Sequence, residues 1–239
     1  DYFTLIGTTD ADHEGSLDHV TATAEEIAYL CQSAGVYFKQ KLTPADVIYS
    51  YAGVRPLVDD GSGKPETASR GYHFDIDANA EGQAPILSVF GGKITTYRHL
   101  AESAVGRLAR YLPMLSGDSW TADAPLPGGD FAIDGAGELA ETLSCNYPFL
   151  DIKLIHRLVR SYGTRSSVLL GNAQCVTDLG AHFGHGLYQS EVDYLVAHEW
   201  ARCAEDVLWR RSKLGLRFTE QERAALDYYV RSCVANELV

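Results

Sequence analysis

The sequence lacks a long hydrophobic run, paired cysteines and an excess of positive charge, and each absence argues against a class of protein. No stretch approaches the run of about 20 apolar residues that crosses a bilayer. The five cysteines are scattered and never spaced as C-x-x-C, which favours free thiols over a zinc site or a disulfide framework. With 32 acidic and 20 basic residues the net charge is -12, so nucleic acid is not expected as a partner.

The familiar catalytic motifs are also missing. There is no G-x-S-x-G, no H-E-x-x-H and no P-loop, so hydrolase and NTPase functions lack support. Residues 135–140 match G-x-G-x-x-A, but only a three-residue apolar stretch precedes them, and we interpret them as a loop that enters a helix. His182 and His185 have a spacing that would allow a shared metal, yet no carboxylate–histidine pattern accompanies them, and no metal site is expected.

What remains is the composition of a globular protein. Of the 239 residues, 46% are hydrophobic and 22% are charged, which is enough for one large domain or two small ones. The first ten residues have no basic segment or cleavage motif typical of a signal peptide. They look like a strand entered near its start, and we expect the chain to begin partway through a larger protein.

The first half mixes predicted strands and helices. A capping box of Thr23 and Glu26 predicts a helix, Thr43 and Pro44 predict a further helical turn, and Thr95 or Thr96 begins a helix that reaches Leu112. The strand predicted at residues 85–90 is almost wholly apolar, so we expect it to be central in its sheet. The predicted strands cover residues 3–9, 47–52, 71–77 and 85–90.

The second half is predicted to be helical. Thr219 and Glu222 form another capping box, and Gly163 stands where a glycine commonly ends a helix. The fold class is therefore α+β, with a mixed sheet followed by an all-helical C-terminal domain. Proline and glycine between the halves predict a linker at residues 114–127. The helices are expected around residues 137–145, 151–162, 165–170, 188–198, 201–213 and 219–236.

Arg55 is the first candidate binding residue. It lies in the run YAGVRPL (51–57), where a strand is expected to end and a proline follows. An arginine held at a rigid strand end can bind a carboxylate or phosphate through two bonds. An exposed structural ion pair explains the same residue, and the local sequence leaves both interpretations of Arg55, and of Arg70, open.

A second candidate is the turn that contains Gly91, Gly92, Lys93, Ile94 and Thr95. An apolar strand leads into two glycines and then a helix start. The glycines allow a ligand to approach the backbone, and the helix start offers free N–H groups to negative charge. Lys93 adds a cation. A structural strand-to-helix turn remains the alternative, although it has no need of a lysine there.

These segments resemble the second half of the FAD-dependent glycerol-3-phosphate dehydrogenases, and the resemblance extends over the whole chain. The matching run at residues 194–215 is long and specific. The matching runs are FTLIGTTD (3–10), YAGVRPL (51–57), SVFGGKITTYR (88–98), LPGG (126–129), YPFL (147–150), LLGNA (169–173), DLG (178–180), FGH (183–185) and YLVAHEWARCAEDVLWRRSKLG (194–215).

The resemblance implies an arrangement of domains. Residues 1–113 would be the end of the FAD/substrate-binding domain, with its sheet a remnant of that body, and residues 128–239 a helical cap. The amino-terminal flavin motif of the family is absent from this sequence, and a candidate catalytic histidine of the family is expected upstream. We therefore expect the fragment itself to be inactive and to hold no FAD, although the full-length enzyme would bind it.

The resemblance also implies roles for individual residues. Arg55, Arg70 and Lys93 would bind the substrate, with Arg55 also acting in catalysis. The flavin would contact the backbone of Gly91, Gly92, Lys93, Ile94 and Thr95.

The implied reaction is oxidation of sn-glycerol 3-phosphate to dihydroxyacetone phosphate by hydride transfer to FAD, with electrons passing to quinone. The implied location is cytoplasmic, peripheral on the inner face of the membrane, and a homodimer is a further expectation. The basic residues Arg210, Arg211, Lys213 and Arg217 would suit lipid contact, but a solvated helix end explains them as well. Two alternatives stay open: an oxidase that uses oxygen, and a helical interaction or dimerisation module.

Overall fold

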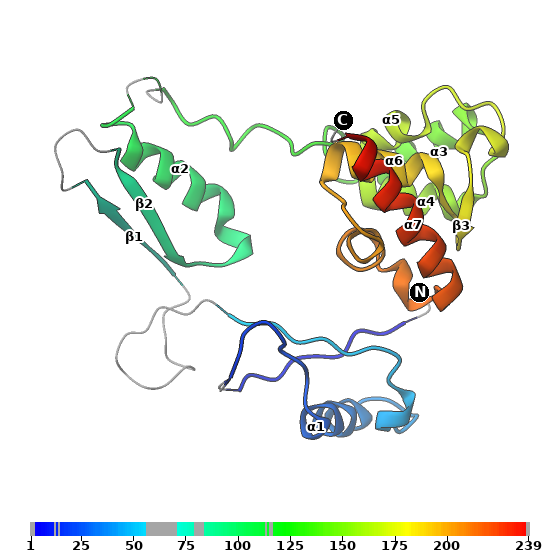
Figure 1. Ribbon diagram of the computed structural model, residues 1–239, viewed down its shortest axis with the longest axis horizontal. Helices are drawn as coiled ribbons and strands as arrows, with labels where there is room; N and C mark the ends of the chain where they lie inside the picture. Colours follow the sequence, from blue (N-terminus) through cyan, green and yellow to red (C-terminus); the bar gives the residue numbers. More distant parts are fainter. Residues whose placement is uncertain are drawn as a thin grey trace. The chain divides into compact units, whose positions relative to one another are not determined.

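A computed structural model describes residues 3–11, 13, 15–55, 71–78, 84–112, 114 and 117–237 (Figure 1). The chain divides into two compact units, Asp1–Ala124 and Pro125–Val239. The division falls inside residues 114–127, the expected linker, and the assignment of domains to the two halves stays a prediction. Helices and two small antiparallel sheets make up the described part, which confirms the α+β class.

The first unit begins with a capped helix, α1 (Ala24–Gly35). The Thr23 hydroxyl accepts a hydrogen bond from the Glu26 N–H at 3.2 Å, and the Glu26 carboxylate accepts one from the Thr23 N–H at 2.9 Å. The expected turn is also present as η1 (Pro44–Asp46). Both local predictions are confirmed because each depends only on residues within one turn.

A hairpin and a helix follow in the same unit. Strands β1 (Tyr72–Asp77) and β2 (Ile86–Gly91) pair antiparallel, with Tyr72 opposite Gly91. The short η2 (Ile94–Thr96) then leads into α2 (Tyr97–Leu108), which runs beside the hairpin (Figure 1). The Arg107 guanidinium lies 5.0 Å from the centre of the Phe74 ring, which places α2 against the β1 face that carries Phe74.

Several expectations for the first unit are wrong. Residues 3–9 and 47–52 are not strands, since neither segment pairs with another strand in the described part of the chain. β2 is not central there: it pairs with β1 alone, and Ile86 and Phe90 remain 64% and 51% exposed. The described pairing is antiparallel where a mixed sheet was expected. Strand pairing depends on distant partners, which a local pattern cannot supply.

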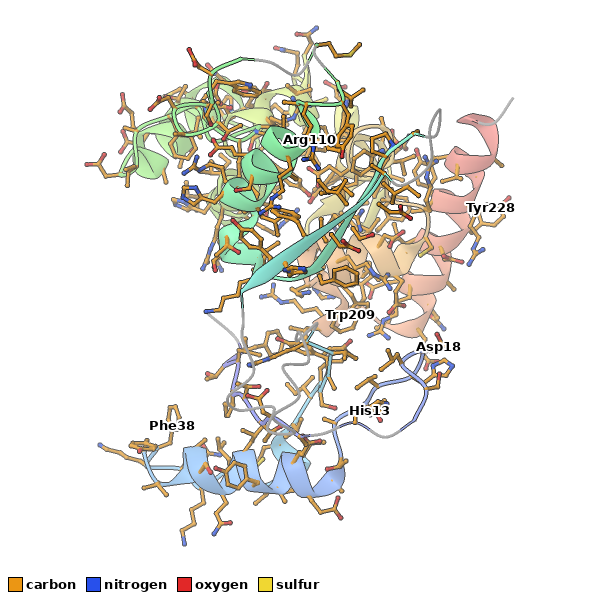
Figure 2. The ribbon with its side chains drawn as sticks, turned by 90° about the vertical axis from the view of Figure 1, so that its left-hand side faces the viewer. His13, Asp18, Phe38, Arg110, Trp209 and Tyr228 are labelled. Carbon is orange, nitrogen blue, oxygen red and sulfur yellow. The ribbon has the colours of Figure 1, made fainter. Side chains whose placement is uncertain are left out.

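The second unit is mainly helical, and its capping signals are confirmed. Thr219 and Glu222 cap the last helix reciprocally at 2.8 and 3.3 Å, and Gly163 ends α4 with φ 54°. Tyr228, on that last helix, is 81% exposed and projects outward (Figure 2). The α-helices are α3 (Ala136–Asn146), α4 (Ile152–Tyr162), α5 (Ser166–Leu170), α6 (Gln189–Glu199) and α7 (Glu220–Glu237). The shorter helical segments are η4 (Gly163–Arg165), η5 (Val176–Leu179), η6 (Asp206–Ser212) and η7 (Leu214–Leu216).

Two features of this unit differ from the expected helices. The helix expected over residues 201–213 contains a π-helix, η6, which ends at Lys213 in a left-handed conformation with φ 68°. The histidines expected in a loop belong to a small hairpin of β3 (His182–Gly184) and β4 (Leu187–Tyr188): His182 begins β3 and His185 lies in the turn, so the unit is not all helical. Gly186 makes the tight turn with φ 78°.

The hydrophobic core lies in the second unit. The side chains of Leu187, Val192, Leu195, Val207 and Leu226 are completely buried where the helices meet. Fully burying one such side chain stabilises a fold by about 1.5–3 kcal/mol. In the described part of the first unit, by contrast, Cys31 and Phe74 are the only buried hydrophobic residues. The helical unit therefore has a core of its own.

Candidate functional site

The predicted glycine turn joins β2 to α2. Gly91 and Gly92 have φ angles of 72° and 95°, which L side chains rarely adopt. The Gly92 N–H donates to the Gly71 carbonyl at 2.9 Å. A Cβ atom on Gly92 would lie 3.2 Å from Leu100 Cδ1, so Gly92 is required by the backbone and by the packing of α2.

The helix start beyond the turn presents free donors. Thr96 Oγ1 accepts from the Lys93 N–H at 3.3 Å and donates to the Lys93 carbonyl at 2.9 Å. The N–H groups of Ile94 and Thr95 have no acceptor within the described ranges, as expected for the first residues of a helix. Lys93 is exposed and has no ion pair with any described residue. The turn therefore offers two N–H groups and an ammonium group.

Arg55 occupies an extended segment rather than the end of a strand. Its guanidinium lies 3.4 Å from the Asp10 carboxylate, with the two side chains 43% and 59% exposed. An exposed pair of this kind contributes about 0–1 kcal/mol, so an anionic ligand could replace Asp10 at little cost. The proline that follows, and Arg70, lie outside the described residues.

The predicted convergence of Arg55, Arg70 and Lys93 stays a prediction. Arg55 and Lys93 belong to the same compact unit, but residues 56–70 between them are not described. Of the predicted site, the structure brings together the cofactor turn, from Gly91 to Thr95.

Arg98, in the same sequence run, is committed to a structural cluster. Its NH1 group lies 2.9 Å from the Glu102 carboxylate, which also accepts hydrogen bonds from the hydroxyls of Ser119 and Thr121. Those two hydroxyls, followed by the Arg98 charge, hold the pKa of Glu102 below its usual range. The cluster ties residues 119–121 to α2, and the cation is not free for a substrate.

The helical unit contains a buried charge network that the sequence did not reveal. Glu191 on α6 is 2% exposed and accepts two bonds of 2.6 Å from Arg157 on α4. The Tyr162 hydroxyl donates to the same carboxylate at 2.7 Å. Burial and the Glu191 charge raise the pKa of Tyr162, so its hydroxyl stays a donor. These partners lie 29 and 34 residues apart, and no local pattern signals them.

The basic residues near η6 interact with their own unit. Arg210 and Arg211 lie 3.1 and 3.6 Å from the Asp206 carboxylate, and Arg211 also donates to the Glu199 carbonyl at 2.6 Å. The Lys213 ammonium donates to the Trp209 carbonyl. Within the described part of the chain, no helix has the length and apolar character needed to cross a membrane.

Both of these histidines, His182 and His185, have protein partners. His182 accepts a hydrogen bond from the Gly186 N–H at 3.2 Å and its ring lies 4.7 Å from the Tyr188 ring, tilted by 38°, and His185 lies 3.9 Å from the Glu222 carboxylate. Over the ranges that the structure describes, no three His, Cys, Asp or Glu residues form a group that could hold a metal ion.

Comparison with known proteins places these features in a family. Residues 119–238 match the family described as the C-terminal domain of alpha-glycerophosphate oxidase. A glycerol-3-phosphate dehydrogenase of Pseudomonas aeruginosa is 49% identical over 97% of this chain, and an aerobic glycerol-3-phosphate dehydrogenase of Escherichia coli is 44% identical over 96% of it. A D-erythritol 1-phosphate dehydrogenase of Brucella abortus is 49% identical over 92%.

The chain spans less than half the length of these relatives, 45%, 45% and 43% respectively. The resemblance identified in the sequence is confirmed, since the matches to the dehydrogenases cover both compact units and the family match covers the helical one. The chain belongs to the alpha-glycerophosphate oxidase C-terminal domain family.

Proposed function

We propose that this chain supplies substrate-side residues to a flavoenzyme that oxidises sn-glycerol 3-phosphate to dihydroxyacetone phosphate. The observation that carries the proposal is identity of 44–49% with two glycerol-3-phosphate dehydrogenases along almost the whole chain. The proposal concerns the complete enzyme. The Pseudomonas aeruginosa relative is more than twice as long as this chain.

Binding of the substrate phosphate is assigned to Arg70 and Lys93. A phosphate dianion needs cations at fixed positions, and each charge-assisted hydrogen bond contributes about 1.5–3 kcal/mol. Lys93 suits this role because it is exposed, lies at a helix start and has no ion pair with a described residue. Arg55 would orient the hydroxyl end of the substrate and stabilise charge that develops at C2. It is available for this role because its exposed ion pair with Asp10 can be exchanged for a contact with the substrate.

The turn from Gly91 to Thr95 is proposed to contact FAD. When bound, FAD accepts the hydride from C2 of the substrate and carries additional negative charge afterwards. The donor set fits such a group: two N–H groups without acceptors among the described residues, at a helix start, next to two glycines with positive φ. Backbone donors at this position stabilise developing negative charge without having to reorganise. The chain by itself is proposed to be colourless and inactive.

The proposal further includes transfer of the electrons to quinone at the inner face of the cytoplasmic membrane. The enzyme would be a homodimer in peripheral contact with lipid. An oxidase that passes the electrons to oxygen uses the same substrate-side residues. Oxygen uptake by the complete enzyme in the absence of quinone distinguishes the two.

A second substrate is supported by a specific comparison. The D-erythritol 1-phosphate dehydrogenase is as similar to this chain as a glycerol-3-phosphate dehydrogenase is, at 49% identity each. Both substrates are phosphorylated polyols, so the same cations serve the phosphate and the difference lies at the hydroxyl end. Arg55 and its surroundings are therefore where the choice between a three-carbon and a four-carbon substrate is expected to be made.

Anaerobic reduction of the flavin tests the proposal directly. The complete enzyme is mixed with sn-glycerol 3-phosphate or D-erythritol 1-phosphate, and bleaching of the flavin absorption is followed by stopped flow. Fast bleaching by glycerol 3-phosphate supports the first candidate, and selective bleaching by erythritol 1-phosphate supports the second. An enzyme that binds flavin but is bleached by neither substrate would contradict both.

A further inference from the structure

The helical unit contains an open cleft of about 420 Å³ that the proposed reaction does not use. It is lined by the end of α4, by η4, by one face of α6 and by the loop at Pro127. All of these segments belong to the second compact unit, so the cleft lies within one body. Polar and charged side chains from three elements converge on it.

Arg165 of η4 gives the cleft a positive charge. Its side chain is half-buried, its Nε group donates to the Tyr194 hydroxyl, and its guanidinium carbon lies 5.3 Å from the centre of the Tyr194 ring. Within the described residues, no carboxylate pairs with Arg165, and its NH1 and NH2 groups have no acceptor. Tyr194 therefore fixes one edge of the guanidinium and leaves the other edge free.

A comparison with Arg157 shows what Arg165 lacks. Arg157, in the same unit, directs its two terminal nitrogens at the Glu191 carboxylate and donates to the Gly186 carbonyl. An arginine stays charged at all physiological pH values, and a partly buried charge without a partner is costly. The free edge of a guanidinium matches two oxygens of a phosphate or carboxylate group. The guanidinium of Arg165 is thus oriented so that its terminal nitrogens could bind an anion.

The other lining residues restrict what can enter. The His198 ring packs 4.9 Å from the Tyr194 ring, and Ser161 adds a hydroxyl from the end of α4. Glu199 also lines the cleft and disfavours a second negative group there, while it can accept a hydrogen bond from a hydroxyl. We propose that this cleft binds the phosphate or carboxylate group of a small hydroxylated molecule, with Arg165 as the anion-binding residue.

Calorimetric titration of the 239-residue chain with inorganic phosphate tests the site. We expect saturable binding with a Kd on the order of 1 mM. Arg165→Gln should weaken binding at least about tenfold, and Arg165→Lys should weaken it less, because lysine keeps the charge but loses the two-pronged geometry. Titrations with acetate and with glycerol 3-phosphate show whether a carboxylate or a phosphate ester is preferred at the site.

Two control variants make the test specific. Arg160→Gln removes an exposed arginine of α4 that does not line the cleft, and Lys93→Gln removes the cation of the proposed substrate site. Arg160→Gln should leave phosphate binding unchanged, whereas Lys93→Gln removes any contribution of the proposed substrate site and should leave the part that depends on Arg165. Far-UV circular dichroism checks that each variant is folded. Absence of saturable binding, an undiminished affinity in folded Arg165→Gln, or an equal loss in Arg160→Gln would overturn the proposal. If phosphate binding were lost in Lys93→Gln and kept in Arg165→Gln, the phosphate would bind in the first unit, and this result would also overturn the proposal for the cleft.

Discussion

Arg157 and Glu191 form a two-bond ion pair that links α4 to α6, with both N–O distances 2.6 Å. Arg157 also donates to the Gly186 carbonyl, which joins the β3–β4 turn to the same network. Burial lowers the pKa of Arg157, but the hydrogen bonds and charge of Glu191 outweigh it and leave the pKa raised. Arg157 remains charged, and it ties α4 to the β3–β4 turn and α6, which lie 29 and 34 residues further along the chain.

Glu191→Gln is expected to destabilise the helical unit. The change leaves the Arg157 guanidinium, whose side chain is 22% exposed, without a counter-charge. Removing one partner of a buried pair typically lowers the free energy of unfolding by about 3–5 kcal/mol. Urea unfolding followed by circular dichroism measures the loss. The exposed Glu205 is the control, since Glu205→Gln should change the free energy by less than about 0.5 kcal/mol. Equal effects of the two variants would contradict a special role for the pair.

Gly163→Ala should destabilise the same unit far more than Gly171→Ala. Both glycines end helices with nearly the same backbone, φ 54° and 55° and ψ -131° and -133°, so both variants carry similar backbone strain, on the order of 1–3 kcal/mol. A Cβ atom on Gly163 would also lie 1.8 Å from the Gly128 carbonyl oxygen, whereas one on Gly171 meets nothing within 4 Å.

The difference between the two glycine variants therefore isolates the close approach of the loop at Gly128 to the end of α4. The Thr164 N–H donates to the same Gly128 carbonyl at 3.1 Å, so the clash would also disturb that bond. Thermal unfolding of both variants measures the difference. Similar melting temperatures would show that the loop can move aside.

Features that depend on a few neighbouring residues were predicted from the sequence, and features that depend on distant partners were not. The capping boxes at Thr23 and Thr219 and the glycine that ends α4 each involve one turn of chain, and all three are confirmed. The strands expected at residues 3–9 and 47–52 are wrong, because β-branched composition favours a strand only where another strand can pair with it.

The same distinction applies to the candidate site. The turn at Gly91 and Gly92 was predicted because two glycines, a lysine and a helix start are adjacent in the sequence. The cleft at Arg165 and Tyr194 was missed because its residues lie 29 positions apart. An arginine two residues after a helix-ending glycine carries no local sign that its charge has no carboxylate partner among the described residues.

Asp206→Asn should destabilise the region around η6 at neutral pH and not at low pH. The Asp206 carboxylate accepts the Arg202 N–H at 2.9 Å and pairs with Arg210 and Arg211. Burial raises the pKa of Asp206, but the Arg202 N–H, the Cys203 thiol and the two arginine charges outweigh it and hold the pKa below the ordinary value of 3.8.

Because the folded-state pKa of Asp206 is lowered, its contribution is present above about pH 4 and is lost as the pH falls through the folded-state value. We expect a loss of about 1–2 kcal/mol at pH 7 in Asp206→Asn, which shrinks as the pH falls below the ordinary pKa of 3.8. Unfolding by urea at a series of pH values measures the trend. A loss that stays constant from pH 7 to pH 3 would exclude the charge of Asp206 as its cause.

Arg70→Ala and Lys93→Gln in the complete enzyme should each raise the KM for glycerol 3-phosphate. Loss of one charge-assisted bond of about 1.5–3 kcal/mol corresponds to an increase of about 10- to 150-fold. The phosphate does not react, so its contacts hold the ground state and the transition state about equally, and kcat should change much less than KM. Steady-state kinetics with a quinone analogue measures both constants.

Lys39→Gln is a matched control for Lys93→Gln, since Lys39 is also an exposed lysine of the first unit and follows α1. It should leave both constants unchanged. An unchanged KM in Arg70→Ala would remove Arg70 from the phosphate site. A fall in kcat with an unchanged KM in Lys93→Gln would instead place the ammonium group beside the reacting atoms, because a contact made only in the transition state affects kcat and not ground-state binding.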